Sequence, residues 1–203
     1  MSDLHTLPNH GLGWLDASGE HAGVVLSTRI RLARNLQGHA FGPRARVNDR
    51  EAVLDQTRRA MDKVELLAGS TLLALPDLDH RSRGMLLERR LASRELLGDV
   101  KVGPSRATAV LLAAQDPLSV MVNEEDHLRL QGLLSGLRLK EAWNLVDRLD
   151  EELGQELPFA YHHEFGFLTS CPTNVGSGLR ASVLVHLPGL VLTKEIGKVL
   201  QGL

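Results

Sequence analysis

The chain has 203 residues, of which 43% are hydrophobic, and a formal net charge of -2 from 23 Lys and Arg against 25 Asp and Glu. This length allows one large domain or two small ones around a substantial core. The charge provides no overall attraction to nucleic acid or to an anionic membrane, and 2 Trp, 1 Tyr and 4 Phe are too few for a base-stacking platform. A single Cys excludes an intrachain disulfide, and no apolar run is long enough to cross a bilayer, so we expect a cytoplasmic protein.

The first part of the chain divides into an arm and a strand. Residues 1–22 are polar and show no periodicity, which predicts a loose N-terminal arm. Residues 24–32 follow, and from Leu26 onward they alternate between apolar or threonine residues and polar ones. An extended segment there directs Arg29 and Arg31 to one side of a sheet.

Helical patterns come next. Asn48, with an acid three residues later, predicts an N-cap for an amphipathic helix over residues 49–67. A second helix is expected over residues 85–97, and the polar residues 76–84 between the two predict a loop.

The second half of the chain mixes strands with one helix. Residues 108–113 and 118–122 are short apolar runs that predict an antiparallel hairpin. Residues 140–153 have apolar side chains at helical spacing, and residues 165–170 and 179–187 read as strands on either side of a glycine-rich turn. The order predicts an α+β fold with an antiparallel sheet.

An unusual cluster of charge, VNEEDHLR, occupies residues 122–129. If this segment is extended, Glu125, His127 and Arg129 share one face while Leu128 points into the core. A base and an anion-binding group would then project into one cleft. The alternative is an exposed loop of solvated charge, since unpaired charges are costly to bury.

Arginines are the second candidate for chemistry. Arg29 and Arg31 on one strand, Arg129, and Arg180 with Ser182 on another strand make an anion site plausible, because guanidinium groups bind phosphate oxygens in pairs. Taken singly, each arginine is more often a surface salt-bridge partner.

Cys171 is the third candidate. It precedes a proline at a junction between a strand and a loop, where a lone cysteine is usually a small buried hydrophobe. Nearby arginines would favour its thiolate and make it a contact for a cationic substrate. The His and Cys spacing of a metal site is absent, so we expect no metal bound by the protein side chains alone.

Three motifs together resemble one family. Residues 27–35 (STRIRLARN), 122–129 (VNEEDHLR) and 169–183 (TSCPTNVGSGLRASV) resemble the ATP:guanidino phosphotransferases, or phosphagen kinases, and within them the bacterial protein-arginine kinases. The resemblance covers residues 23–203. It implies the guanidino kinase catalytic domain, an antiparallel β-sheet flanked by helices, with its C-terminal part missing.

The resemblance also implies roles for individual residues. Glu125 is the catalytic carboxylate that orients and deprotonates the guanidinium, and Cys171 lies beside that substrate group. The residues expected to bind ATP are Ser27, Thr28, Arg29, Ile30, Arg31, Arg129, Arg180, Ala181, Ser182, Val183 and Leu184. ATP and Mg²⁺ are the expected cosubstrate and cofactor.

The implied activity is ATP-dependent phosphorylation of arginine side chains in proteins. Kinases of small guanidino compounds carry a helical domain before the first arginine motif, whereas only 26 residues precede Ser27 here, which favours the protein-directed branch. The partners implied are a stress-response repressor, clients of a Clp-type protease and a zinc-finger activator protein.

Two departures from the family leave alternatives open. Arg90 stands where the family commonly has His, at a position associated with nucleotide binding. The family also continues beyond the last residue of this chain, so we expect weak or absent turnover and an exposed sheet edge that favours a homodimer. The alternatives are a non-catalytic nucleotide-binding regulatory homologue and a kinase of a small guanidino compound.

Overall fold

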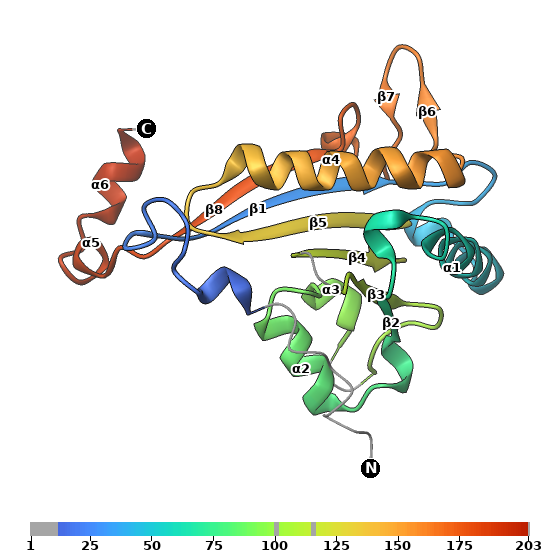
Figure 1. Cartoon of the computed structure of the whole chain (residues 1–203), viewed down its shortest axis with the longest axis horizontal. Helices are drawn as coiled ribbons and strands as arrows, with labels where there is room; N and C mark the ends of the chain where they lie inside the picture. Colours follow the sequence, from blue (N-terminus) through green and yellow to red (C-terminus); the bar gives the residue numbers. More distant parts are fainter. Residues whose placement is uncertain (1–11, 100–101, 115–116, 203) are drawn as a thin grey trace.

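An antiparallel sheet of six strands, in the order β2-β3-β4-β5-β1-β8, organises the chain (Figure 1). The computed structural model describes residues 12–99, 102–114 and 117–202. The strands of this sheet are β1 (Val25–Arg34), β2 (Thr71–Ala74), β3 (Ala109–Leu112), β4 (Leu118–Val122), β5 (Leu128–Ser135) and β8 (Leu179–Val185). A separate hairpin contains β6 (Tyr161–His162) and β7 (Gly166–Phe167). The helices are α1 (Val47–Met61), α2 (His80–Glu88), α3 (Arg94–Leu97), α4 (Leu139–Glu156), α5 (Pro188–Leu192) and α6 (Ile196–Gln201).

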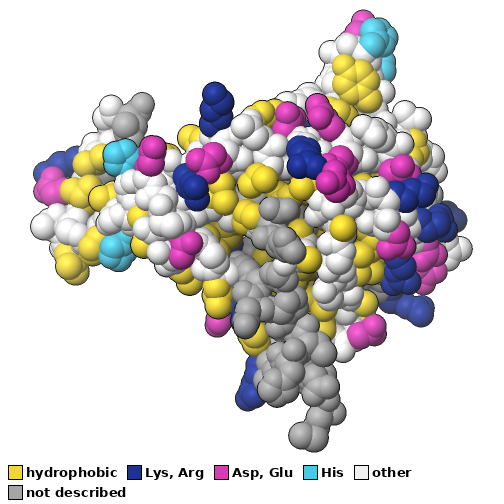
Figure 2. All heavy atoms as spheres, viewed as in Figure 1, with side chains coloured by type: hydrophobic (Ala, Val, Ile, Leu, Met, Phe, Trp, Pro, Cys, Tyr) yellow, Lys and Arg dark blue, Asp and Glu magenta, His cyan; other side chains and the backbone are white. Residues whose placement is uncertain are grey.

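Helix α4 covers one face of the sheet along β1 and β5 (Figure 1). Its apolar residues recur at helical spacing and are buried, at Ala142, Val146, Leu149 and Leu153. They belong to one core with Ile30, Leu32, Leu128, Leu130 and Val53 of α1. The helix predicted over residues 140–153 is confirmed, and its outer surface carries the mixed charges visible in Figure 2.

Helices α2 and α3 pack on the opposite face, over the short strands. Leu86 and Leu96 are buried there against Val110, Leu112 and Met121. Because β3 and β4 are covered on both faces, every residue in them is buried, which explains their continuous apolar runs. The predicted hairpin of β3 and β4 is confirmed; the turn residues 115–116 lie outside the described residues.

The helix predicted over residues 49–67 has different ends. Helix α1 begins at Val47, so Asn48 lies inside it and is not the N-cap. The backbone N–H of Arg46 instead donates to Asp49 Oδ2 (3.0 Å). A 3-10 turn at Glu65–Leu67 follows the end of the helix.

The single helix predicted over residues 85–97 is two helices. Helix α2 starts earlier, because Asp79 Oδ1 accepts a hydrogen bond from the Ser82 N–H (2.7 Å) and caps it, so the predicted loop over 76–84 was wrong in its second half. Helix α2 ends before Arg90, which has a φ of 62°. Ser93 then caps α3. The strand predicted over residues 165–170 is also shorter, since only Gly166–Phe167 is strand.

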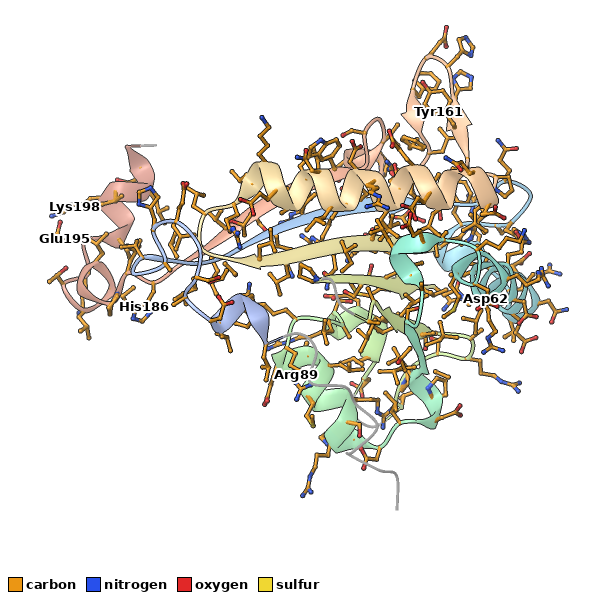
Figure 3. The ribbon with its side chains drawn as sticks, viewed as in Figure 1. Asp62, Arg89, Tyr161, His186, Glu195 and Lys198 are labelled. Carbon is orange, nitrogen blue, oxygen red and sulfur yellow. The ribbon has the colours of Figure 1, made fainter. Side chains whose placement is uncertain are left out.

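The first described residues lie against the sheet. A 3-10 turn at Gly13–Leu15 lies against β1 and β5, and the Leu137 N–H donates to the Glu20 carbonyl (2.8 Å). Residues 1–11 of the predicted arm lie outside the described residues. Figure 3 shows the β6–β7 hairpin, with Tyr161, projecting beyond α4, and the segment of α5 and α6, with Glu195 and Lys198, at the far end.

Strand β8 forms one edge of the sheet. Its only pairing partner among the described residues is β1, and three of its apolar residues are exposed, at Leu179, Val183 and Val185. An edge of this kind offers unpaired backbone groups to another strand. Self-association through this edge stays a prediction. None of the helices in the described parts of the chain is both long and apolar enough to span a membrane.

Packing of α4 on β5 can be tested at Gly132. A Cβ added there would lie 2.8 Å from Val146 Cγ2, a buried atom, so Gly132→Ala should destabilise the fold by about 1–3 kcal/mol. Gly84→Ala is the control, because its Cβ meets nothing within 4 Å in helix α2 and should stabilise by about 0.5–1 kcal/mol. Urea denaturation followed by circular dichroism measures both. Equal stability of Gly132→Ala and wild type would contradict the packing.

Candidate active site

The register of β1 with its two neighbours gathers arginines on one face of the sheet. Arg31 is the cross-strand partner of Arg180 on β8, and Ala33 is the partner of Arg129 on β5. Cross-strand partners point to the same side, and Arg29 shares that side because it lies two residues before Arg31. The four arginines therefore lie on one face: strand periodicity predicted this for Arg29 and Arg31, and the strand pairing adds Arg129 and Arg180.

Little negative charge balances these arginines. Burial, followed by the charges of Arg29, Arg129 and Arg180, lowers the pKa of Arg31 to about 10. Burial and then the charges of Arg90, Arg180 and Arg129 also lower the pKa of Arg29. Burial is the larger cause of both shifts, and the neighbouring guanidinium charges act in the same direction, so the site is both desolvated and positive.

Buried polar atoms in the same place lack hydrogen-bond partners. Within the described part of the chain, nothing bonds to Nε of Arg29, Nε of Arg31 or Oγ of Ser27. Orphaned donors beside like charges are costly unless an anion satisfies them. The arrangement therefore fits a polyphosphate.

A small cleft of about 80 Å³ opens among these groups. Its lining comes from β1, β5, β8 and two loops, and includes Arg31, Ala33, Glu125, Arg129, Asn174, Gly178 and Arg180. A larger cavity of about 460 Å³ lies beside α2 and α3, and none of its described lining residues is one of the predicted site residues. We therefore place the candidate site at the smaller cleft, because it is lined by the arginines and by Glu125.

Two adjacent glutamates have different surroundings. The Glu124 side chain is 2% exposed, and its Oε1 accepts from Arg129 Nη1 (2.6 Å) and from Ser93 Oγ (2.5 Å). The Glu125 side chain is 46% exposed, and its Oε2 makes a longer contact with Arg129 Nη2, at 3.4 Å. Glu124 is thus committed to Arg129, whereas Glu125 has oxygens available to a substrate. A role for Glu124 was not predicted from the sequence. The one indication of such a role in the sequence was its position in the acidic triplet 124–126.

The prediction that His127 shares a face with Glu125 and Arg129 was wrong. Residues 123–127 form a bend instead of a strand, and Asn123 at its start has a φ of 60°. His127 is buried, with Nδ1 accepting from the Leu36 N–H (3.0 Å) and Nε2 lying 3.1 Å from the Ala40 carbonyl. Nδ1 is therefore the acceptor and Nε2 carries the proton.

The loop that carries Cys171 is attached to the acidic segment. The Ser170 N–H donates to Asp126 Oδ1 (2.6 Å), and Ser170 Oγ donates to the Glu125 carbonyl (2.8 Å). Cys171, the next residue, is half-buried, and its Sγ lies 2.9 Å from Thr173 Oγ1. Segments that are distant in the sequence thus place the thiol in the neighbourhood of Glu125.

Other predicted site residues divide by strand face. Ser182 is the partner of Arg29, and Leu184 is the partner of Ser27, so both lie on the arginine face. Residues of opposite parity, Thr28, Ile30, Ala181 and Val183, lie on the other face. Thr28 is used by the fold, since its Oγ1 donates to the Gly136 carbonyl (2.6 Å) and accepts from the Arg138 N–H (3.0 Å). These four residues can reach an arginine-face ligand only through their backbone.

Arg90 adds a fifth guanidinium near this face. Its charge is the largest electrostatic contribution to the lowered pKa of Arg29, after burial. Its guanidinium lies over the Trp14 ring, 5.2 Å from the centroid, and Gln131 Nε2 donates to its carbonyl (2.8 Å). The structure therefore places Arg90 at the end of the cluster where Arg29 lies.

Known proteins are similar to this chain in sequence and in fold. The ATP:guanido phosphotransferase, C-terminal catalytic domain, matches residues 52–203. The chain belongs to this family. A relative named protein-arginine kinase from Pelotomaculum thermopropionicum is 42% identical over 206 residues, covering 100% of this chain and 56% of that protein. Another of that name, from Moorella thermoacetica, is 45% identical over 194 residues, covering 94% of this chain and 54% of that protein.

The chain spans about half the length of the curated relatives that it matches. Solved structures of two other kinases have a similar fold. Taurocyamine kinase from Schistosoma mansoni, with bound transition state analog components, superposes with a TM-score of 0.73 at 24% identity, over 85% of this chain and 25% of that one. Lombricine kinase superposes with a TM-score of 0.70 at 24% identity, over 87% of this chain and 53% of that one. The predicted guanidino kinase catalytic domain is confirmed as the fold.

The site has few protein ligands for a metal ion. Among the described residues no group of three or more His, Cys, Asp or Glu side chains could hold one. Mg²⁺ usually binds through one or two carboxylates, several waters and the substrate phosphates, and needs no such cage. Glu125, which lines the cleft and is exposed, fits that limited role, whereas Glu124 is committed to Arg129 and Ser93.

The buried imidazole predicts a pH dependence of stability. Burial lowers the pKa of His127 below its ordinary value of 6.5, so the neutral ring stabilises the fold fully above that pH, and this contribution is lost as pH falls through the lower folded-state pKa. The stability gap between wild type and His127→Gln should be widest near pH 8 and shrink toward pH 5, by at most about 1.4 kcal/mol per pH unit. Urea titrations measure it. A gap that stays constant with pH would contradict the effect, and His163→Gln, at an exposed histidine, is the control substitution.

Because the clustered arginines repel one another, removing one should raise the stability of the fold and lower its affinity for polyphosphate. Arg31→Met removes a guanidinium that burial and its neighbours disfavour, so the unliganded chain should become more stable. Its affinity for tripolyphosphate should fall about tenfold or more, the loss expected for one charge-assisted contact. Thermal unfolding and titration calorimetry measure the two effects. Unchanged affinity would argue against a polyphosphate site, and Arg148→Met, on the exposed side of α4, is the matched control.

Proposed function

We propose that this chain carries the catalytic centre for ATP-dependent phosphorylation of arginine side chains in proteins. The observation that supports this most strongly is the placement of exposed Glu125 beside Arg129, at the edge of an arginine cluster with unsatisfied donors. An anion site and an available carboxylate are the two parts that phosphoryl transfer to a guanidinium needs.

The arginine cluster would bind and align the phosphates of ATP. Transfer of a phosphoryl group spreads charge over its oxygens, and fixed guanidinium groups stabilise that charge without reorganising. Arg31, Arg129 and Arg180 line the cleft and are the groups placed to do so. Mg²⁺, when bound with ATP, would neutralise further phosphate charge.

Glu125 would act on the arginine substrate. A free guanidinium is cationic, with a pKa above 12, and is a poor nucleophile. A carboxylate within hydrogen-bond distance can hold one nitrogen in line and accept its proton as the N–P bond forms. Cys171, on the loop tied to the Glu125 carbonyl through Ser170, would contact the same guanidinium.

Protein substrates are proposed because the relatives reported above are named protein-arginine kinases. We propose a stress-response repressor and clients of a Clp-type protease as substrates, a zinc-finger protein as activator and the cytoplasm, where ATP is available, as the location. A homodimer through the β8 edge is part of the same proposal.

Substitution of the carboxylate tests the reaction. Glu125→Gln should lower the rate of phosphate transfer from γ-labelled ATP to an arginine-rich protein by about 10²–10⁴-fold, because it removes the proton acceptor. Affinity for ATP should be unchanged or slightly tighter, since the variant removes a negative charge beside Arg129.

The acid-labile label on arginine, identified by mass spectrometry, is the measurement. Glu141→Gln, an exposed carboxylate on α4, is the matched control and should keep wild-type activity. Binding of ATP without any transfer by the wild-type chain would favour the non-catalytic regulatory alternative. Faster phosphorylation of free arginine than of protein would favour the small-guanidine alternative.

A further inference from the structure

Two neighbouring residues at the end of β1, Arg34 and Asn35, are buried polar groups that the proposed reaction does not use. Their relative exposures are 3% and 1%. A buried polar side chain destabilises the fold unless its hydrogen bonds are satisfied, so the partners of these two side chains indicate what they hold in place. Arg34 bonds to one end of the loop that carries Cys171, and Asn35 bonds to Asp126, which holds the other end.

Arg34 holds the far end of that loop. Its Nη1 donates to the Ser177 carbonyl (2.9 Å), and the Ala33 N–H donates to the Gly178 carbonyl (2.9 Å). Gly178 has a φ of 63°, and a Cβ there would lie 2.6 Å from the Ala33 carbonyl oxygen and 2.7 Å from Arg34 Nη1. Only glycine allows so close an approach between the loop and the strand.

The Arg34 guanidinium is itself fixed in place. Its Nε and Nη2 donate to the two oxygens of Asp150 on α4, at 2.8 and 2.7 Å. Its Cζ lies 3.5 Å from the centroid of the Phe167 ring, at the base of the β6–β7 hairpin. A planar fork bonded on one side and stacked on a ring is rigid, so Ser177 is held against a fixed donor.

Asn35 holds the near end of the loop. Its Nδ2 donates to Asp126 Oδ1 (2.7 Å), the same oxygen that accepts from the Ser170 N–H. Its Oδ1 accepts from the His127 N–H (2.8 Å). Asp126, held by Asn35, therefore links the segment that carries Glu125 to Ser170, the residue directly before Cys171.

We infer that Arg34 and Asn35 are positioning residues that hold both ends of the loop 170–178 and so set the distance between Cys171 and Glu125. A guanidino substrate must fit between a thiol and a carboxylate on different segments, and a misplacement of about 1 Å costs a large factor in rate. The role in substrate binding rests on the proposed function. The attachment of the loop does not, and it can be measured without turnover.

The experiment compares Arg34→Lys with Arg148→Lys in the whole chain. A lysine can stay paired with Asp150 but cannot also donate to Ser177 from a planar fork. Arg148 lies on the same helix as Asp150 and bonds to Glu152 and Glu65 without touching the loop, so it is the matched control. Asp150→Asn, which weakens the fork more gently, replaces Arg34→Lys if that variant fails to fold.

Two readouts follow the loop. Amide hydrogen exchange in residues 167–178 should be faster in Arg34→Lys by about tenfold, the factor expected for loss of one charge-assisted bond, while exchange in α1 is unchanged. Alkylation by iodoacetamide reports on the loop at one position, because the chain has 1 Cys. The alkylation rate should change in Arg34→Lys and stay at the wild-type value in Arg148→Lys.

A third readout separates positioning from mere support of the fold. N-acetylarginine amide should protect Cys171 from alkylation in wild type, at a concentration several-fold lower than in Arg34→Lys, while the Kd for ATP stays the same in both. Equal protection in the two proteins, or equal loosening in Arg34→Lys and Arg148→Lys, overturns the inference. Absence of phosphate transfer in wild type, together with a loosened loop in Arg34→Lys, would refute the proposed function and leave the attachment standing.

Discussion

The pairing of β1 with both β5 and β8 is the constraint on which the rest of the structure depends. In this register Arg31 lies opposite Arg180, and Ala33 lies opposite Arg129. A slip of one residue would turn the arginines toward α4 and the leucines toward the cleft, because side chains alternate along a strand. Burial of Ile30 and Leu32 beneath α4 opposes that slip. The apolar core therefore specifies the position of charges on the opposite face.

The gathered arginines have an energetic cost that the surrounding structure offsets. Burial, and then repulsion between the guanidinium groups, lowers the pKa values of Arg29 and Arg31, so the charged form of each is less favourable here than in water. The buried carboxylate of Glu124 pairs with Arg129, and the leucine-rich core on the other face of the sheet stabilises the strands that carry the arginines. Unfavourable charge repulsion of this kind is expected at an anion-binding site, because the negative charge of a bound anion offsets it.

Patterns in the sequence predicted the larger elements well and the boundaries poorly. The period of α4 and the alternation of β1 are local properties, and both were confirmed. The break between α2 and α3 was missed because it depends on Arg90 adopting a positive φ, and the Gln131 bond to its carbonyl holds it there. The bend before β5 was missed for a similar reason, since buried His127 bonds to the backbone of Leu36 and Ala40.

By itself the sequence determined the family, the antiparallel fold and the shared face of Arg29 and Arg31, because motifs and strand alternation are properties of nearby residues. The pairing of β1 with β5 and β8 brought Arg129 and Arg180 to that face. Only the tertiary structure decided that Glu124 is paired while Glu125 is exposed, and that His127 belongs to the core. It alone also showed that Arg34 bonds to one end of the Cys171 loop and that Asn35 bonds to Asp126, which holds the other end. Those distinctions arise from contacts between segments far apart in the chain, which no local pattern encodes.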